Sequence, residues 1–198
     1  MKRLEFFCAL VLLCLVSTAG AAQSLADKFV EAANSLENPN VVYDGSYRRL
    51  DYPLGDVPAD TGVCSDVIIR AYRIIGIDLQ QLVHEDMSAH FSSYPSDWGL
   101  TRPDKNIDHR RVPNLRVFFK RKGVVLDAST DANDYKPGDI VTWNLSEHRV
   151  LPHIGIVTDK LSPDHRRPLI MHNIGNGQVF EDILFKYRIT GHYRYALD

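Results

Sequence analysis

Cysteine is scarce in this chain of 198 residues, which contains only three: Cys8, Cys14 and Cys64. The first two lie in an apolar run near the N-terminus, so a chain processed after residue 22 keeps Cys64 alone. A single cysteine excludes an internal disulfide. The chain also has neither a CxxC pair nor an HExxH motif, and we expect no metal and no cofactor. The remaining thiol is either a small buried apolar side chain or a reactive group.

Long hydrophobic runs are also missing. The apolar run from Phe6 to Val16 is well short of the roughly 20 residues that a membrane-spanning helix needs. Two basic residues precede this run and small residues follow it, which is the pattern of a secretory signal peptide. We therefore expect residues 1–22 to be a cleaved signal peptide rather than a transmembrane anchor. The mature chain is then exported across the inner membrane, to the periplasm or the extracellular space, without stable membrane insertion.

A strong excess of basic charge is absent as well. Removal of residues 1–22 leaves 176 residues, takes the basic side chains from 23 to 21 and the acidic ones from 25 to 24, and gives a net charge of −3. Nucleic-acid binders are usually strongly basic, so we expect no nucleic-acid partner. The length suits one domain with its own core, and the sequence has no internal repeat. We expect a single monomeric domain over residues 23–198.

The first half of the mature chain has helical periodicity. Ser24 is a suitable N-cap, with Asp27 three residues on, for a helix that ends before Asn38. A second helix is expected over residues 65–75, before Gly76. Further helices are expected over residues 77–91 and 114–122, and a structured loop over residues 41–61.

The second half predicts short strands. The runs KPGDIVTWNL, HIGIVTD and PLIMHNIGNG are rich in strand-forming residues and bounded by turn residues. Two more strands are expected over residues 178–183 and 189–195. Helices first and short strands after them indicate an α+β domain with an antiparallel sheet.

Cys64 stands at or just before the start of the helix expected over residues 65–75. Unpaired backbone N–H groups and the positive end of the helix dipole favour a thiolate there. We therefore expect the pKa of this thiol to lie below the free value of about 8.5. A thiolate can attack a carbonyl carbon, and the same N–H groups can hold the resulting oxyanion.

Two histidines could complete such a site. His153 opens the HIGIV strand and His172 lies on the next strand, so an antiparallel pairing can bring both rings onto one face. Gly155 leaves room beside the first imidazole. His153 would then take the thiol proton and His172 would orient it. Asn173, which points to the opposite face of a regular strand, is the second candidate for the orienting role. Alternatively, each histidine only satisfies local hydrogen bonds.

The order of these residues resembles the NlpC family of papain-like cell-wall peptidases, in which the nucleophilic cysteine is followed by a strand histidine and a third polar residue. The matching segments are Cys64-Ser65, Gly138–Val141 and His153–Val157. The resemblance implies a papain-like fold, with N-terminal helices and the catalytic cysteine at a helix N-terminus packed on a C-terminal antiparallel sheet. Val63 and Asp66 depart from the Asp-Cys-Ser-Gly pattern of that family, so the resemblance does not extend to its usual substrate subsite.

A second resemblance covers nearly the whole mature chain. The segments GVCSDVIIRAYR, IDHRRVPNL, HIGIV, HNIG and ITGHYRY are similar to the bacterial domain-of-unknown-function family numbered 1287, within the same superfamily. The stretch from Tyr52 to Asp56 also resembles a Tyr-x-x-Gly-Gly element of NlpC enzymes. By that resemblance the Tyr52 hydroxyl contacts the oxyanion or the substrate, with Tyr43 as second candidate. Ser65 and Asn173 are further candidates for such contacts, and packing in the loop is the alternative for the tyrosines.

Two adjacent arginines, Arg110 and Arg111, follow Asp108 and His109. The fork of an arginine suits a carboxylate, so both are candidates for binding a substrate carboxylate. The alternative is a structural network in which Asp108 pairs with one of them.

Together these features predict a secreted thiol hydrolase that cleaves an amide bond through a Cys64 acyl-enzyme, with His153 as the base. The resemblance indicates peptidoglycan stem peptides as the substrate, and another amide compound is the alternative. One alternative is an acyltransferase or amidase of the same fold that acts on another acyl compound. A second is a non-catalytic cell-wall binding module.

Overall fold

The computed structural model describes residues 23–197, so the signal peptide expected over residues 1–22 lies outside the described part of the chain. Within that part there are four α-helices: α1 (Leu25–Ser35), α2 (Cys64–Ile74), α3 (Leu79–Ala89) and α4 (Val112–Lys122). Two short 3-10 turns, η1 (Phe91–Ser93) and η2 (Asp108–Arg110), lie between α3 and α4, and a third, η3 (Ala132–Asp134), follows α4. The strands are β1 (Val42–Tyr43), β2 (Thr61–Gly62), β3 (Val124–Leu126), β4 (Ile140–Asn144), β5 (Pro152–Leu161), β6 (Pro168–Asn173), β7 (Gln178–Glu181) and β8 (Arg188–Arg194).

The expected helices are confirmed, with bounds shifted by a few residues. Ser24 caps α1: its hydroxyl accepts from the Asp27 N–H at 3.0 Å, and the Asp27 carboxylate accepts from the Ser24 N–H at 3.2 Å. This reciprocal pair satisfies two donors that a helix start leaves without partners. α2 ends just before Gly76, whose φ of +84° is open to glycine at little cost.

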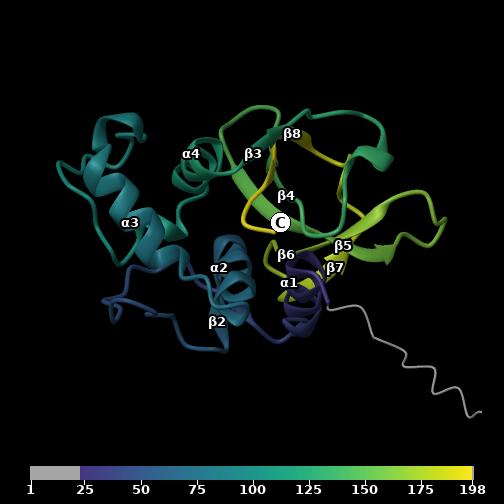
Figure 1. Ribbon diagram of the computed structural model, residues 1–198, viewed down its shortest axis with the longest axis horizontal. Helices are drawn as coiled ribbons and strands as arrows, with labels where there is room; N and C mark the ends of the chain where they lie inside the picture. Colours follow the sequence, from purple (N-terminus) through teal and green to yellow (C-terminus); the bar gives the residue numbers. More distant parts are fainter. Residues whose placement is uncertain (1–22, 198) are drawn as a thin grey trace, which may run out of the picture.

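The main sheet is antiparallel, with strand order β3-β8-β4-β5-β6-β7. The chain therefore folds as an α+β protein with an antiparallel sheet, as the order of helices and strands predicted. β4 to β7 follow one another as neighbours, whereas β8 returns to lie between β3 and β4. Figure 1 shows α3 and α4 at one end of the molecule and the sheet at the other.

Each face of the sheet has its own apolar cluster. On the helical side, Ile154, Ile156 and Met171 pack with residues of all four helices. On the other side, Trp143, Val157 and Ile170 pack with Ile183 and Leu184, which follow β7. Residues 140–143 of β4 and 153–158 of β5 are all buried, because successive side chains of a strand point to opposite faces and both faces are covered. The sheet thus separates two apolar layers, and helix α2 packs against β5 and β6.

Two features of this fold shape the region around Cys64. β1 pairs with β2 in parallel, which brings Tyr43 opposite Gly62, two residues before Cys64. The pairing of β5 with β6 begins at Ile156 and Met171, so the start of β5 has no ladder partner on β6. The N-terminus of α2 lies against this unpaired start. No helix within residues 23–197 has the length and hydropathy needed to cross a membrane.

Candidate active site

Cys64 is the first residue of α2. The chain enters the helix through β2, and the N–H of Val63, the N-cap residue, donates to Asp66 Oδ2 at 2.6 Å. This contact satisfies the N–H of the residue that precedes the helix, and Cys64, as the first helical residue, does not serve as the N-cap. The thiol is 4% exposed and lies at the base of a surface cavity.

Burial raises the pKa of the Cys64 thiol to about 11. The nearby Ile154 N–H lowers the pKa, the charge of Asp66 raises it, and the Tyr43 hydroxyl and the Ser65 N–H lower it further without offsetting burial. The expectation of a pKa below 8.5 from the helix start alone is therefore wrong. Desolvation of a thiolate in a nearly closed site outweighs a helix dipole that is effective only within the first turn.

The two histidines lie on one face of the sheet, as the strand pattern predicted. His153 Nε2 is 2.9 Å from His172 Nδ1, with ring centroids 5.0 Å apart and the ring planes at 82°. Both rings are buried, and Trp143 on β4 packs against His153 at 5.9 Å between centroids. Burial, followed by the charge of His172, lowers the pKa of His153 to about 3. In the free protein His153 is therefore neutral and able to accept a proton.

Glu181 on β7 extends this pair. Its Oε2 lies 3.1 Å from His172 Nε2, within the distance of an ion pair but not aligned as a hydrogen bond. Burial lowers the pKa of His172, the Glu181 charge raises it, and Lys186 lowers it. Glu181 was not among the site residues predicted from the sequence. Its signal was the two-residue period on β7, which places Glu181 on the same face as Val179, the partner of His172 in the strand register.

Gly155 makes room for the histidine pair. A Cβ built there would lie 2.5 Å from Ile170 Cγ2 and 3.3 Å from His172 Cβ. Such contacts are too close for any larger residue unless β6 shifts. The glycine therefore allows β6 to approach β5 closely enough for the two imidazoles to meet.

Asn173 has a different role in this structure. Its amide nitrogen donates to the Gly62 carbonyl at 3.3 Å, and its Oδ1 accepts from the Gly175 N–H at 2.9 Å. These contacts tie the end of β6 to the entry of α2. His172, rather than Asn173, lies in contact with His153.

Tyr43, not Tyr52, lies beside Cys64. Tyr43 lines the same cavity as the thiol, and burial, followed by the charge of Cys64, raises the pKa of its hydroxyl. Tyr52 instead packs edge-on against His84 at 5.3 Å, with the Lys105 ammonium 5.2 Å from its ring centroid. Tyr52, the first candidate, therefore packs within the loop, and Tyr43, the second candidate, lies at the thiol.

Ser65 and Arg110 form a buried hydrogen-bond network next to Cys64. The Ser65 hydroxyl donates to the Arg110 carbonyl at 2.7 Å. The Arg110 guanidinium donates to both oxygens of Asp66, at 2.8 and 2.9 Å, and to the backbone carbonyls of Asp44 and Ser46. Both side chains are nearly fully buried, so their polar groups are occupied by the protein itself. Arg110 therefore has a structural role, which was the alternative to binding substrate, but its carboxylate partner is Asp66 rather than Asp108.

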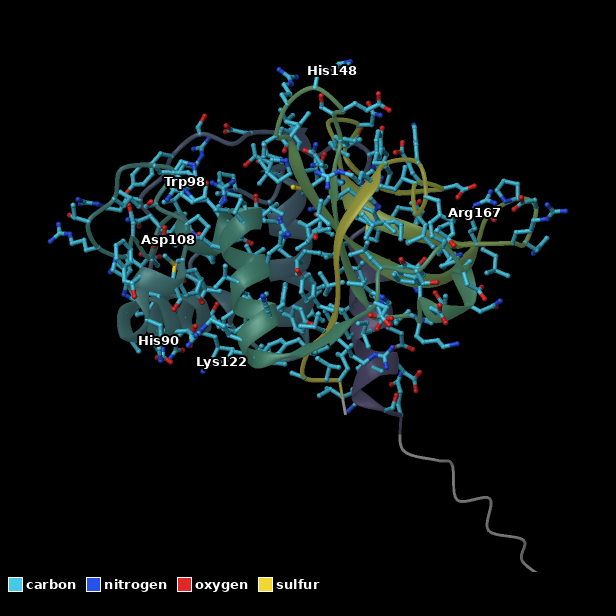
Figure 2. All side chains as sticks on the ribbon, turned by 90° about the horizontal axis from the view of Figure 1, so that it is seen from above. His90, Trp98, Asp108, Lys122, His148 and Arg167 are labelled. Carbon is cyan, nitrogen blue, oxygen red and sulfur yellow. The ribbon has the colours of Figure 1, made fainter. Side chains whose placement is uncertain are left out.

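Arg111 points elsewhere. Its Nη1 donates to Asp108 Oδ1 at 3.2 Å, and its guanidinium carbon lies 4.1 Å from the ring centroid of Trp98. Figure 2 shows Trp98 and Asp108 at the same end of the molecule, opposite to Arg167. The pairing of Asp108 with an arginine was anticipated, whereas Trp98 was not singled out, because nothing in its irregular segment fixes where the ring lies.

The cavity over Cys64 has a volume of about 450 Å³. Pockets of this size hold small ligands or a short stretch of peptide. Its walls are mostly apolar or aromatic and are formed by Tyr43, Gly45, Tyr47, Val63, Cys64, Trp98, Ile107, Arg110, Arg111, Val112, Pro113 and Pro152. Pro152 directly precedes His153, so the wall of the cavity also carries the start of the histidine strand. No cluster of three or more histidine, cysteine, aspartate or glutamate side chains suited to a metal ion occurs within residues 23–197.

Comparisons with known proteins cover most of the chain. The family described as "Domain of unknown function (DUF1287)" matches residues 30–195. The "Uncharacterized protein YijF" of Escherichia coli (strain K12) is 54% identical over 165 residues, which cover 83% of this chain and 79% of that protein. No solved structure matches. Because the family match spans well over half of the sequence, the chain belongs to the domain-of-unknown-function family DUF1287.

Proposed function

We propose that this protein is a secreted, papain-like thiol hydrolase that cleaves amide bonds in peptidoglycan stem peptides. The observation that carries the proposal is one constellation: a cysteine at a helix start, lining a cavity, with the hydrogen-bonded pair His153 and His172 on the adjoining strands. A buried cysteine that only filled space would need neither a cavity over it nor a contact with the backbone of Ile154, the residue that follows His153. The resemblance to the NlpC family supplies the substrate class, and the expected signal peptide supplies the compartment.

The ring contacts define the proton positions that this chemistry requires. His153 Nε2 is engaged with His172, which leaves Nδ1 as the nitrogen that receives the Cys64 proton. A base at Nδ1 carries its own hydrogen at Nε2 and donates it to His172 Nδ1. His172 then carries its hydrogen at Nε2, on the side of the Glu181 carboxylate. The hydrogen bond between the two rings then has one donor and one acceptor, and the hydrogen on His172 Nε2 faces the Glu181 carboxylate.

The reaction follows from these positions. The Cys64 sulfur forms a bond to the amide carbon as its proton passes to His153 Nδ1. The Ile154 and Ser65 N–H groups and the Tyr43 hydroxyl, which lower the pKa of the thiol in the free protein, are the donors that we assign to the oxyanion. The carbon–nitrogen bond then breaks, and the amine leaves with the proton from His153. Water, deprotonated by His153, attacks the thioester, releases the acid and restores the thiol.

Digestion of purified peptidoglycan tests the proposal. The wild-type protein should release fragments whose masses correspond to cleaved amide bonds, and the Cys64→Ser protein should release none. An added amine separates hydrolysis from acyl transfer, because a transferase yields the amide of the added amine. If wild type and Cys64→Ser give the same pattern, the proposal is wrong.

A further inference from the structure

The cavity over Cys64 offers a cation but no anion. Among the described residues that line it, none is aspartate or glutamate and two are arginines. Arg110 is consumed by Asp66 and two backbone carbonyls. Arg111 is therefore the charged group available to a ligand in this cavity.

The Arg111 guanidinium is held in a fixed plane. Asp108, which is 1% exposed, accepts from its Nη1, while Trp98 lies against the face of the group at 4.1 Å. Its Nε and Nη2 make no hydrogen bond to any residue that the structure describes. These two nitrogens form one side of the fork, and that side can donate two parallel hydrogen bonds to a carboxylate.

We propose that Arg111 and Trp98 form a carboxylate-binding subsite next to Cys64, so that the substrate carries a carboxylate near the scissile amide. The apolar and aromatic walls then contact the uncharged part of the substrate. A substrate recognised there by a free amino group does not fit, because the lining offers it no carboxylate. This inference rests on the proposed use of Cys64 as the nucleophile and names the group that the enzyme selects.

A pair of thiol reagents that differ in one charge tests it. N-bromoacetyl-alanine and its amide react in the same way: the Cys64 sulfur bonds to the methylene carbon and bromide leaves. Labelling of Cys64 is followed by mass spectrometry over a range of reagent concentrations at pH 9. In the wild type, half-saturation should come at roughly 10-fold lower concentration for the acid than for the amide, the size expected of a charge-assisted pair.

Two variants separate recognition from general charge effects. Arg111→Gln should raise the half-saturating concentration of the acid alone, by about 10-fold, and leave the maximal labelling rate unchanged. Arg102→Gln removes an exposed cation from the same region but not from the cavity, and it should change neither reagent. Equal losses for both reagents in Arg111→Gln, or the same loss in Arg102→Gln, would overturn the subsite.

A second measurement does not depend on a reactive thiol. In the Cys64→Ser protein, N-acetyl-alanine should shift the NMR signal of the Trp98 indole N–H, assigned with Trp98→Phe, and its amide should not. Arg111→Gln should abolish the shift. A shift of equal size with acid and amide overturns the carboxylate subsite even if the thiol is reactive. Conversely, a thiol that resists alkylation beside a carboxylate-specific shift overturns the proposed function and leaves the subsite standing.

Discussion

His153 Nε2 lies 2.9 Å from His172 Nδ1, so each imidazole determines which nitrogen of the other carries hydrogen. A neutral base that accepts at Nδ1 must donate at Nε2, and His172 must then accept at Nδ1. The Glu181 carboxylate, 3.1 Å from His172 Nε2, favours a hydrogen on that nitrogen and so leaves His172 Nδ1 as the acceptor. The two rings therefore act as one unit. Because His153 is the base and His172 only orients it, we expect the loss of His153 to reduce activity more than the loss of His172.

Replacing the histidines should show this inequality. His153→Ala should lower kcat by about 10³-fold or more, because no base remains. His172→Ala should lower kcat by roughly 10- to 100-fold, since a group that orients the base contributes less than the base itself. Circular dichroism should show both variants folded. Equal turnover in His172→Ala and wild type would leave the orienting role to another group.

Glu181→Gln tests the end of the chain. Glutamine keeps the size and an acceptor oxygen but removes the charge that favours a protonated imidazole. We expect kcat to fall about 3- to 10-fold with KM unchanged. Glu181 raises the pKa of His172 and Lys186 lowers it, so removing the carboxylate should lower the pKa of the histidine pair and move the acidic limb of the pH–rate profile to lower pH. Glu31→Gln, on the exposed face of α1, is the matched control. An unmoved acidic limb would contradict the role of Glu181.

The sequence predicted the parts of the fold that local patterns determine. Ser24 and Asp27 mark the start of α1, and Gly76 marks the end of α2. Strand β3 was missed because it has three residues and pairs with β8, almost seventy residues later. No local pattern carries that information, and the same holds for the position of β8 between β3 and β4.

The site likewise contains contacts that local patterns predict and contacts that depend on long-range packing. The contact of His153 with His172 was predictable because both lie on adjacent strands with a two-residue period. The choice of Tyr43 over Tyr52 depends on the short parallel pair of β1 and β2, which has no sequence signal. The difference between Arg110 and Arg111 arises because η2 turns neighbouring side chains in different directions, one toward Asp66 and one toward Trp98.

The raised pKa of Cys64 predicts a distinctive pH dependence. A thiol with a pKa of about 11 is about 0.1% thiolate at pH 8, so alkylation by iodoacetamide should accelerate about 10-fold per pH unit up to pH 10. The sign follows from burial, which favours the neutral form. Rates are measured on the native protein, with labelling of Cys64 confirmed by mass. A plateau between pH 5 and 8 would instead show a thiolate paired with a protonated His153.

Arg110→Gln should destabilise the fold more than Arg111→Gln. The first variant leaves Asp66 without its partner in a buried ion pair, a change that typically costs about 3–5 kcal/mol. For a domain of this size we expect Tm to fall by roughly 10 °C. Arg111 is partly exposed and pairs with Asp108 through one nitrogen, so its loss should lower Tm by only a few degrees. Thermal unfolding followed by circular dichroism measures both, and equal losses would contradict the structural role of Arg110.

Gly155→Ala tests whether close approach of β6 to β5 is needed for activity. The added methyl would press on Ile170 Cγ2 and on His172 Cβ, so β6 must move away and lengthen the contact between the two imidazoles. We expect kcat to fall toward the value of His172→Ala, with KM little changed because the cavity lining does not include Gly155. If the methyl acts through His172, the double variant Gly155→Ala/His172→Ala should be no slower than His172→Ala alone, since the second change removes a contact already lost. Fully additive losses in kcat would show that the methyl acts by another route, such as a general loosening of the sheet, and a drop in Tm shared by the single and double variants would identify that route.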